Sequence, residues 1–126
     1  MLNFSSIMLN TENLDVLVKF YKEVFNKEPE MMEDGYAGFV VGTGFFGIGF
    51  HDKIHGKAKD ADRVLFNFET SKVKEEFERV SKIEGITVVK EPYSMGEGDM
   101  YWVATLADPD GNLFQLVSPW DDGGKN

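Results

Sequence analysis

The sequence predicts an α+β fold built from two related units, each a strand followed by a helix and then by further strands. Two stretches carry apolar residues at helical spacing, and each follows a short apolar segment typical of a strand. The expected helix starts, Asn13 and Ser71, are as far apart in the sequence as the expected helix ends, Phe25 and Ile83. A turn at Asp108–Asn112 closes the last hairpin. These three observations indicate a repeated architecture.

The first helix is predicted from residue 14 to near Asn26, after a strand at residues 4–10. Thr11 or Asn13 can cap it, because their side-chain oxygens accept hydrogen bonds from N–H groups of the first turn. Pro29 prevents the helix from continuing much further. Its apolar side chains recur at helical spacing and form one stripe, namely Leu14, Leu17, Val18, Tyr21 and Phe25.

Two segments rich in aromatic and β-branched residues complete the first unit. Residues 36–41 and 45–50 are predicted as strands, and the Gly42-Thr43-Gly44 segment between them is a hairpin signal. The polar residues 51–62 contain Gly, Lys and Asp with little periodicity. We therefore expect a linker between the two units there.

The second unit repeats this order. Ser71 is expected to cap its helix and Gly85 to end it in a left-handed conformation. The apolar face of this helix contains Val73, Phe77, Val80 and Ile83. In the closing turn, Pro109 suits the second position of a type I turn and Gly111 supplies the left-handed residue. The predicted strands of this unit are residues 63–69, 86–90, 101–107 and 113–118.

Composition limits the classes of protein that the chain can be. Its 126 residues suffice for one domain, and an apolar fraction of 42% is enough to fold. The net charge of −9 repels phosphate backbones, so we expect no nucleic-acid partner. No apolar run is long enough for a membrane span, and we expect no signal peptide. The chain contains no cysteine, which excludes disulfides and thiolate metal sites and fits the cytoplasm.

Two motifs near opposite ends of the chain carry a family resemblance. Phe20-Tyr21-x-x-Val24-Phe25 on the first helix resembles the FYxxVLG signature of the vicinal oxygen chelate superfamily. Asp108-Pro109-Asp110-Gly111-Asn112-Leu113-Phe114-Gln115-Leu116 resembles the terminal DPDGNxxEL segment of the same superfamily. That superfamily includes glyoxalase I, bleomycin-resistance proteins and extradiol dioxygenases. The motifs and the repeat between them span nearly the whole chain.

The resemblance implies a single domain over residues 1–126, made of two βαβββ modules at about 1–52 and 62–120. In the family, the modules form a curved mixed sheet with a U-shaped cleft, the helices lie outside, and homodimers are common. In its metalloenzymes, four side chains, usually His, Glu or Gln, project into the cleft. They bind a divalent metal that polarises vicinal oxygens of the substrate.

The same resemblance places the four metal-ligand positions at Ser6, Gly47, Leu65 and Gln115. The helix motif sets Ser6, the terminal motif sets Gln115, and the repeat supplies the other two. Gly and Leu have no donor atom, whereas transition metals prefer imidazole, carboxylate or thiolate ligands. A register error of one residue brings no better set. We therefore expect no metal and no other cofactor.

His51 and His55, with Asp52 between them, have the spacing of two metal ligands on one face of a helix. They lie in the Gly-, Lys- and Asp-rich linker with no third ligand nearby, so solvent-exposed loop histidines are the favoured interpretation. No serine lies in a nucleophile elbow, and neither histidine has a recognisable triad partner. The sequence therefore identifies no catalytic residue and leaves open whether the protein is an enzyme.

Strand alternation extends the candidate site beyond the four ligand positions. Met8 shares the parity of Ser6, and Phe45 and Gly49 share that of Gly47. Gly47 and Gly49 are expected to leave room for a ligand. Tyr101 and Trp102 of the second unit are further candidates. The alternative is that these two aromatic residues belong to the ordinary core. The predicted ligand-binding residues are Ser6, Met8, Phe45, Gly47, Leu65, Tyr101, Trp102 and Gln115.

These observations favour a protein that binds a small aromatic or cationic molecule in an apolar cleft without metal, as in the bleomycin-resistance branch of the family. The alternative is a metal-dependent lyase or dioxygenase of the same superfamily, similar to lactoylglutathione lyase. A structural dimer with a filled, inert cleft is a third interpretation. The expected partners are a small-molecule ligand and a second copy of the chain in a homodimer, with no nucleic acid and no membrane.

Overall fold

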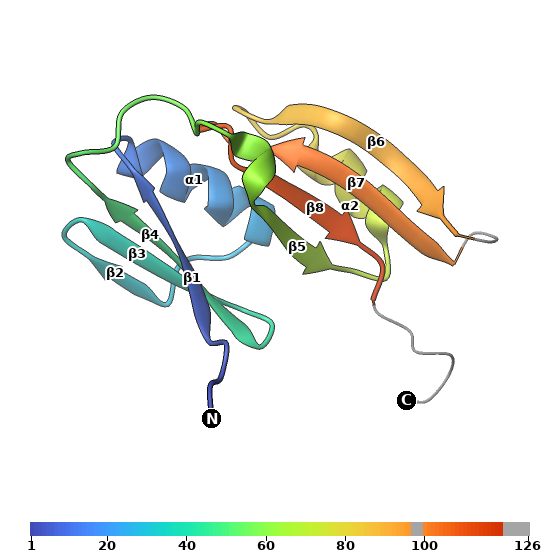
Figure 1. Cartoon of the computed structure of the whole chain (residues 1–126), viewed down its shortest axis with the longest axis horizontal. Helices are drawn as coiled ribbons and strands as arrows, with labels where there is room; N and C mark the ends of the chain where they lie inside the picture. Colours follow the sequence, from blue (N-terminus) through green and yellow to red (C-terminus); the bar gives the residue numbers. More distant parts are fainter. Residues whose placement is uncertain (97–99, 120–126) are drawn as a thin grey trace. The chain divides into compact units, whose positions relative to one another are not determined.

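The computed structural model describes residues 1–96 and 100–119 and contains two units of the same construction (Figure 1). The chain divides into these compact units between Lys57 and Ala58, inside the segment predicted as a linker. Within the described ranges, each unit has one α-helix and one four-stranded mixed sheet. This confirms the predicted α+β class and the βαβββ order. The predicted end of the second module, at residue 120, lies outside the described ranges.

Unit 1 has its strands in the order β1-β4-β3-β2, with β1 parallel to β4 and the other neighbours antiparallel. Its elements are β1 (Ser6–Thr11), α1 (Leu14–Phe25), β2 (Met31–Glu33), β3 (Tyr36–Val41) and β4 (Gly44–Phe50). All of these except β2 are predicted from the sequence. The three residues of β2 are all exposed, so no alternation of buried and exposed side chains marks them as a strand.

The core of unit 1 lies between α1 and one face of the sheet. Tyr21 on α1 is fully buried, and its ring centroid lies 4.8 Å from that of Phe46 on β4. Phe25 packs against the rings of Phe46 and Phe39, with centroids 5.3 and 5.2 Å away. Because side chains alternate along a strand, Phe45 projects from the opposite face. The position of α1 therefore decides which face of the sheet stays uncovered.

Unit 2 repeats this arrangement, in the order β5-β8-β7-β6 with β5 parallel to β8. Its elements are the 3-10 turn η1 (Ala61–Arg63), β5 (Leu65–Glu69), α2 (Val73–Val80), β6 (Thr87–Met95), β7 (Tyr101–Ala107) and β8 (Leu113–Val117). Helix α2 contacts β6, β7 and β8, and Figure 1 shows it behind these strands. On that side Phe114 is fully buried, and its ring centroid lies 5.7 Å from that of Phe68.

Both helices begin without a side-chain cap. The N-cap residues are Asn13 and Lys72, and neither side chain bonds an N–H group of the first turn. Instead, the Thr11 hydroxyl accepts a hydrogen bond from the Asn13 N–H at 2.9 Å, and the Thr70 hydroxyl accepts one from the Lys72 N–H at 3.0 Å. The two units therefore share the same hydroxyl-closed turn ahead of the helix. The prediction of Ser71 as the cap was wrong, because the helix starts one residue later.

Helix α2 also ends earlier than predicted, at Val80 rather than at Ile83. Ile83 is nevertheless buried, because a turn closed by the hydrogen bond from its N–H to the Val80 carbonyl (3.1 Å) returns it to the core. Gly85 takes the predicted left-handed conformation, with φ of +95°. The apolar pattern thus continues for one turn beyond the helix itself.

The Asp108–Asn112 turn is held by the buried Asp108 side chain. The Gly111 N–H donates to the Asp108 carbonyl at 2.8 Å, and Gly111 has the predicted left-handed φ, +83°. The Asp108 carboxylate accepts hydrogen bonds from the N–H groups of Asp110 and Asn112 and from the Asn112 amide, each at 2.9 Å. These bonds satisfy a carboxylate on a residue that is only 1% exposed.

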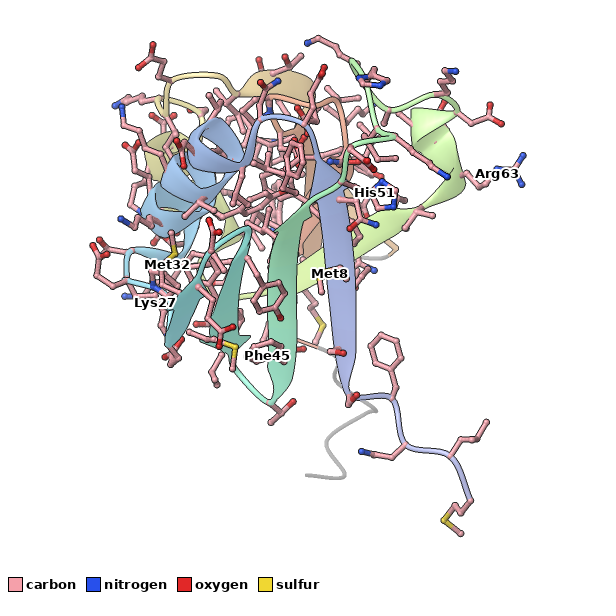
Figure 2. The ribbon with its side chains drawn as sticks, turned by 90° about the vertical axis from the view of Figure 1, so that its left-hand side faces the viewer. Met8, Lys27, Met32, Phe45, His51 and Arg63 are labelled. Carbon is pink, nitrogen blue, oxygen red and sulfur yellow. The ribbon has the colours of Figure 1, made fainter. Side chains whose placement is uncertain are left out.

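A Lys27–Glu30 ion pair takes the place of a neighbouring strand beside β3. Strand β2 pairs only with residues 36–38, so the outer edge of β3 at Val40 has no strand beside it. A Glu30 oxygen accepts from the Val40 N–H at 2.9 Å, while Lys27 donates to the Val40 carbonyl at 2.7 Å and pairs with Glu30. The bond from Lys27, followed by that from Val40, lowers the Glu30 pKa. Figure 2 shows Lys27 beside this edge.

Asp108→Ala is expected to lower the free energy of unfolding by about 3 kcal/mol, because it leaves several buried N–H donors without an acceptor. Urea denaturation followed by circular dichroism measures the change. Asp52→Ala is the control, since the Asp52 side chain is 81% exposed in a loop, and it should cost less than about 0.5 kcal/mol. Equal losses in the two variants would show that the Asp108 bonds do not hold the turn.

In the Glu30→Gln variant, the free energy of unfolding is expected to fall less in acid than it does in the wild type. The pKa of Glu30 is lowered in the folded chain, so its contribution is complete above the ordinary value of 4.5 and is lost as the pH falls through the lowered value. Between about pH 6 and about pH 3, the urea midpoint should therefore fall further for the wild type than for Glu30→Gln. Glu84→Gln is the control, because Glu84 is exposed and forms no ion pair among the described residues, and it should keep the wild-type pH dependence. Identical curves for wild type and Glu30→Gln would contradict this account.

Candidate functional site

The face of the first sheet that lies away from α1 carries the predicted site residues of unit 1, and we call it open face 1. Its residues are Ser6, Met8 and Asn10 on β1, Met31 and Glu33 on β2, Tyr36, Gly38 and Val40 on β3, and Phe45, Gly47 and Gly49 on β4. The strand register aligns four of them across the sheet, and we call this line row 1: Met8, Gly47, Gly38 and Met31. Figure 2 shows Met8 and Phe45 on the neighbouring strands β1 and β4.

Neighbouring side chains lie over the backbone of the two glycines of row 1, Gly38 and Gly47. A Cβ atom at Gly47 would lie 2.7 Å from the Tyr36 hydroxyl and 3.1 Å from the Met8 sulfur. At Gly38, a Cβ atom would meet the ring of Phe45. The room expected at Gly47 is therefore taken by the ends of two flexible side chains. Open face 1 is an apolar surface on which thioether and aromatic groups lie over bare backbone.

The corresponding face of the second sheet lies away from α2, and we call it open face 2, although most of its residues on the two central strands are buried. Its residues are Leu65, Asn67 and Glu69 on β5, Thr87, Lys90, Tyr93 and Met95 on β6, Tyr101, Val103, Thr105 and Ala107 on β7, and Leu113, Gln115 and Val117 on β8. The register aligns a polar line across the four strands, which we call row 2: Asn67, Gln115, Thr105 and Lys90. Within it, the Gln115 side-chain amide donates to the Thr105 hydroxyl at 3.0 Å.

Rows 1 and 2 occupy equivalent positions in the two units. Met8 pairs with Gly47 in unit 1 as Asn67 pairs with Gln115 in unit 2. The preceding pairs on the same faces are Ser6 with Phe45 and Leu65 with Leu113. This pairing agrees with the repeat that relates Gly47 to Gln115 in the sequence. One framework thus presents an apolar row in unit 1 and a polar row in unit 2.

The positions that the family resemblance assigns to metal ligands offer few donor atoms. Ser6 and Gly47 lie on open face 1, and Leu65 and Gln115 lie on open face 2. Together they supply one hydroxyl and one side-chain amide. In the part of the chain that the structure describes, no three or more His, Cys, Asp or Glu side chains cluster as a metal site would require. These residues do not fit a divalent transition metal.

His51 and His55 are exposed in the loop after β4, as expected. The His51 Nδ1 atom accepts from the Lys53 N–H at 3.1 Å, and the His55 Nδ1 atom lies 3.3 Å from a Glu12 oxygen. The other Glu12 oxygen accepts from the Gly56 N–H at 2.6 Å. This bond, followed by the one to His55, lowers the Glu12 pKa. The two histidines therefore hold the loop of unit 1 and do not form a ligand pair.

Tyr101 and Trp102 lie on opposite faces of β7. Tyr101 shares open face 2 with Thr105, because their positions have the same parity. The ammonium group of Lys74, on α2, lies 3.8 Å from the centroid of the Trp102 ring, so Trp102 lies on the α2 side. Its backbone N–H also donates to the Ser118 hydroxyl at 2.9 Å. The structure therefore brings Tyr101, but not Trp102, to the face that carries the polar row.

Sequence reasoning missed most of row 2. Asn67 and Thr105 could have been found by strand alternation, because each has the parity of a predicted site residue on the same strand. Lys90 could not, since β6 has register shifts on both sides of it, between Val88 and Tyr93. Whether any of these residues binds a ligand stays a prediction.

Comparison with known proteins gives one family and a set of related folds. The family model described as the Glyoxalase/Bleomycin resistance protein/Dioxygenase superfamily matches residues 3–116. No curated protein matches the chain.

Three solved structures illustrate the likeness of fold. A glyoxalase-related enzyme from Fulvimarina pelagi is 14% identical, with a TM-score of 0.76 over 100% of this chain and 96% of that one. A glyoxalase/bleomycin resistance protein from Albidiferax ferrireducens T118 is 22% identical, with a TM-score of 0.72 over 92% of this chain and 98% of that one. A genomically encoded fosfomycin resistance protein from Listeria monocytogenes is 20% identical, with a TM-score of 0.71 over 95% of each chain.

Gly47→Ala is expected to be tolerated while moving the side chains that cover row 1. The added methyl group displaces the ends of Tyr36 and Met8, so the free energy of unfolding should change by less than about 1 kcal/mol. The NMR signals of the Met8 methyl group and the Tyr36 ring should shift. Gly49→Ala is the control, because a Cβ atom there meets its nearest neighbours at 3.7 Å, an ordinary contact. A much larger loss of stability at Gly47 would show that the covering side chains cannot move.

Proposed function

The chain belongs to the glyoxalase/bleomycin resistance protein/dioxygenase superfamily, and from this premise we propose that it binds a small organic molecule on the open faces of its sheets. The observation that carries the proposal is the make-up of these faces. Apolar side chains dominate them, and a few groups with directional hydrogen bonds interrupt the apolar surface, as in small-molecule sites generally. No metal takes part at the family's ligand positions in this proposal.

The exposure of large apolar side chains supports a binding role for open face 1. Met8, Met31 and Val40 are 49%, 42% and 44% exposed, although all three lie on one sheet face. Large apolar side chains exposed on one face are unfavourable in water, and apolar surface that is not buried within the chain commonly marks a contact site. Thioether side chains also adapt their shape to a ligand at little cost.

The donor set supports binding without a metal. At the family's ligand positions only the Ser6 hydroxyl and the Gln115 amide can contact a ligand through polar atoms. Both are neutral groups suited to hydrogen bonds with a ligand's own donors and acceptors. A metal-dependent lyase or dioxygenase, the competing function within the superfamily, would need ligands from outside these positions.

The family also supports a proposal for assembly. We propose that the two units act together as one domain and that the protein is a homodimer, as the resemblance implies. The absence of cysteine supports a cytoplasmic location as a further part of this proposal. Light scattering on the purified chain checks the oligomeric state. Separately, no helix in residues 1–96 and 100–119 is long and apolar enough to cross a membrane.

Metal analysis and thermal shift together test the proposed function. Protein purified without chelator should contain much less than one equivalent of Zn, Ni, Fe or Mn. A small-molecule panel should yield compounds that raise the melting temperature, with stabilisation of about 2.7 kcal/mol at about 100 times the Kd. EDTA should not change these shifts. A stoichiometric metal, with ligand shifts that EDTA abolishes, would favour the enzyme instead.

A pair of variants locates the binding surface. Met8→Ala should reduce the ligand-induced shift, because it removes the thioether from row 1. Val16→Ala should not, although Val16 is similarly exposed (55%), because it lies on α1 rather than on an open face. If no compound in a broad panel shifts the melting temperature, the structural dimer with an inert surface becomes the better account.

A further inference from the structure

Row 2 combines neutral hydrogen-bond donors with a cation on one sheet face, and we propose that it recognises a carboxylate group. The ligand's apolar part would lie against the apolar residues of open face 2 on either side of the row. This inference rests on the proposed function, and it adds the chemical class of the ligand. The ligand proposed here is an anion, whereas the chain's acidity by itself favours a cation.

The donors come from the two central strands of the second sheet. The Gln115 amide uses one hydrogen in its 3.0 Å bond to the Thr105 hydroxyl. Its second hydrogen and the hydroxyl hydrogen of Thr105 have no partner among the described residues. Both belong to adjacent strands, which lie about 5 Å apart. A carboxylate accepts two or more such bonds, whereas an ammonium group accepts none.

Lys90 supplies the charge at the β6 end of the row. Its Cα atom pairs with that of Thr105, and its ammonium group lies 5.2 Å from the centroid of the Tyr93 ring on the same face. Lys90 forms no ion pair within the part of the chain that the structure describes. Glu69, the acid on the opposite edge strand of this face, belongs to a different row. Despite the chain's net charge of −9, this end of row 2 therefore presents a cation without an ion-pair partner among the described residues, although the exposed Glu91 is its neighbour in the chain.

Apolar side chains flank row 2 along both central strands. Leu113 and Ala107 pair on one side of the Gln115–Thr105 pair, and Val117 and Val103 pair on the other. A carboxylate over Gln115 and Thr105 thus has apolar side chains two residues away in each direction, each of them at most 9% exposed. The Tyr93 ring adds an aromatic surface beside Lys90. This arrangement suits an aromatic or aliphatic acid better than a strongly hydrated ion such as phosphate.

Matched probes test the charge requirement on the full-length chain. Benzoate, benzamide and benzylamine share a ring and differ in the polar group, and cyclohexanecarboxylate and its amide provide an aliphatic pair. Titrations followed by NMR should show the acids binding roughly tenfold more tightly than the amides, with shifts at Thr105 and Gln115. Lys90→Gln should weaken acid binding by roughly tenfold and change amide binding by less than about twofold. Thr105→Val should weaken acid binding by roughly threefold or more.

Lys74→Gln is the matched control, because Lys74 lies over Trp102 on the α2 side of the same unit. It should leave the acid affinities unchanged. Equal binding of acids and amides, or equal effects of the Lys74 and Lys90 variants, overturns the carboxylate proposal and leaves the proposed function standing. Tighter binding of benzylamine than of benzoate has the same consequence. If neither this set nor the broad panel contains a compound that binds, both proposals fail.

Discussion

Parallel pairing between the first and last strands of each unit is the constraint on which the rest of the structure depends. A parallel pair cannot be joined by a tight turn, so the chain must cross over, and each unit does so through a helix and a hairpin. The helix then packs on one face of the sheet, with Tyr21 against Phe46 in unit 1. Every residue of the opposite parity is left on the open face. The crossover therefore determines which residues form the candidate site, whatever the chemistry of their side chains.

Much of this framework could be predicted because it rests on local signals. The apolar stripe of α1, the left-handed Gly85 and Gly111, and the closing turn at Asp108–Asn112 each follow from nearby residues. Strand β2 and the end of α2 could not be predicted in this way. The first is stabilised by contacts with β3, and the second is a turn that still buries Ile83. Tertiary contacts thus overrode local preference at both places.

In the candidate site, only the positions that follow from the two motifs and the repeat could be predicted. The motifs and the repeat led to Ser6, Gly47, Leu65 and Gln115, all on open faces. Trp102 does not share these faces, because strand parity places it on the side of α2. Finding Lys90 requires the irregular pairing of β6, which no local pattern encodes. The U-shaped cleft that the family implies stays a prediction.

The Lys27–Glu30 pair has a consequence for how the chain behaves among its own copies. An edge strand with free N–H and C=O groups is a template on which another chain can add a strand. Beyond the short β2, both backbone groups of Val40 are already occupied by the side chains of Glu30 and Lys27. A second molecule would have to break an ion pair to extend the sheet there. The two charged residues thus protect this edge against edge-to-edge aggregation, although the neighbouring surface is apolar.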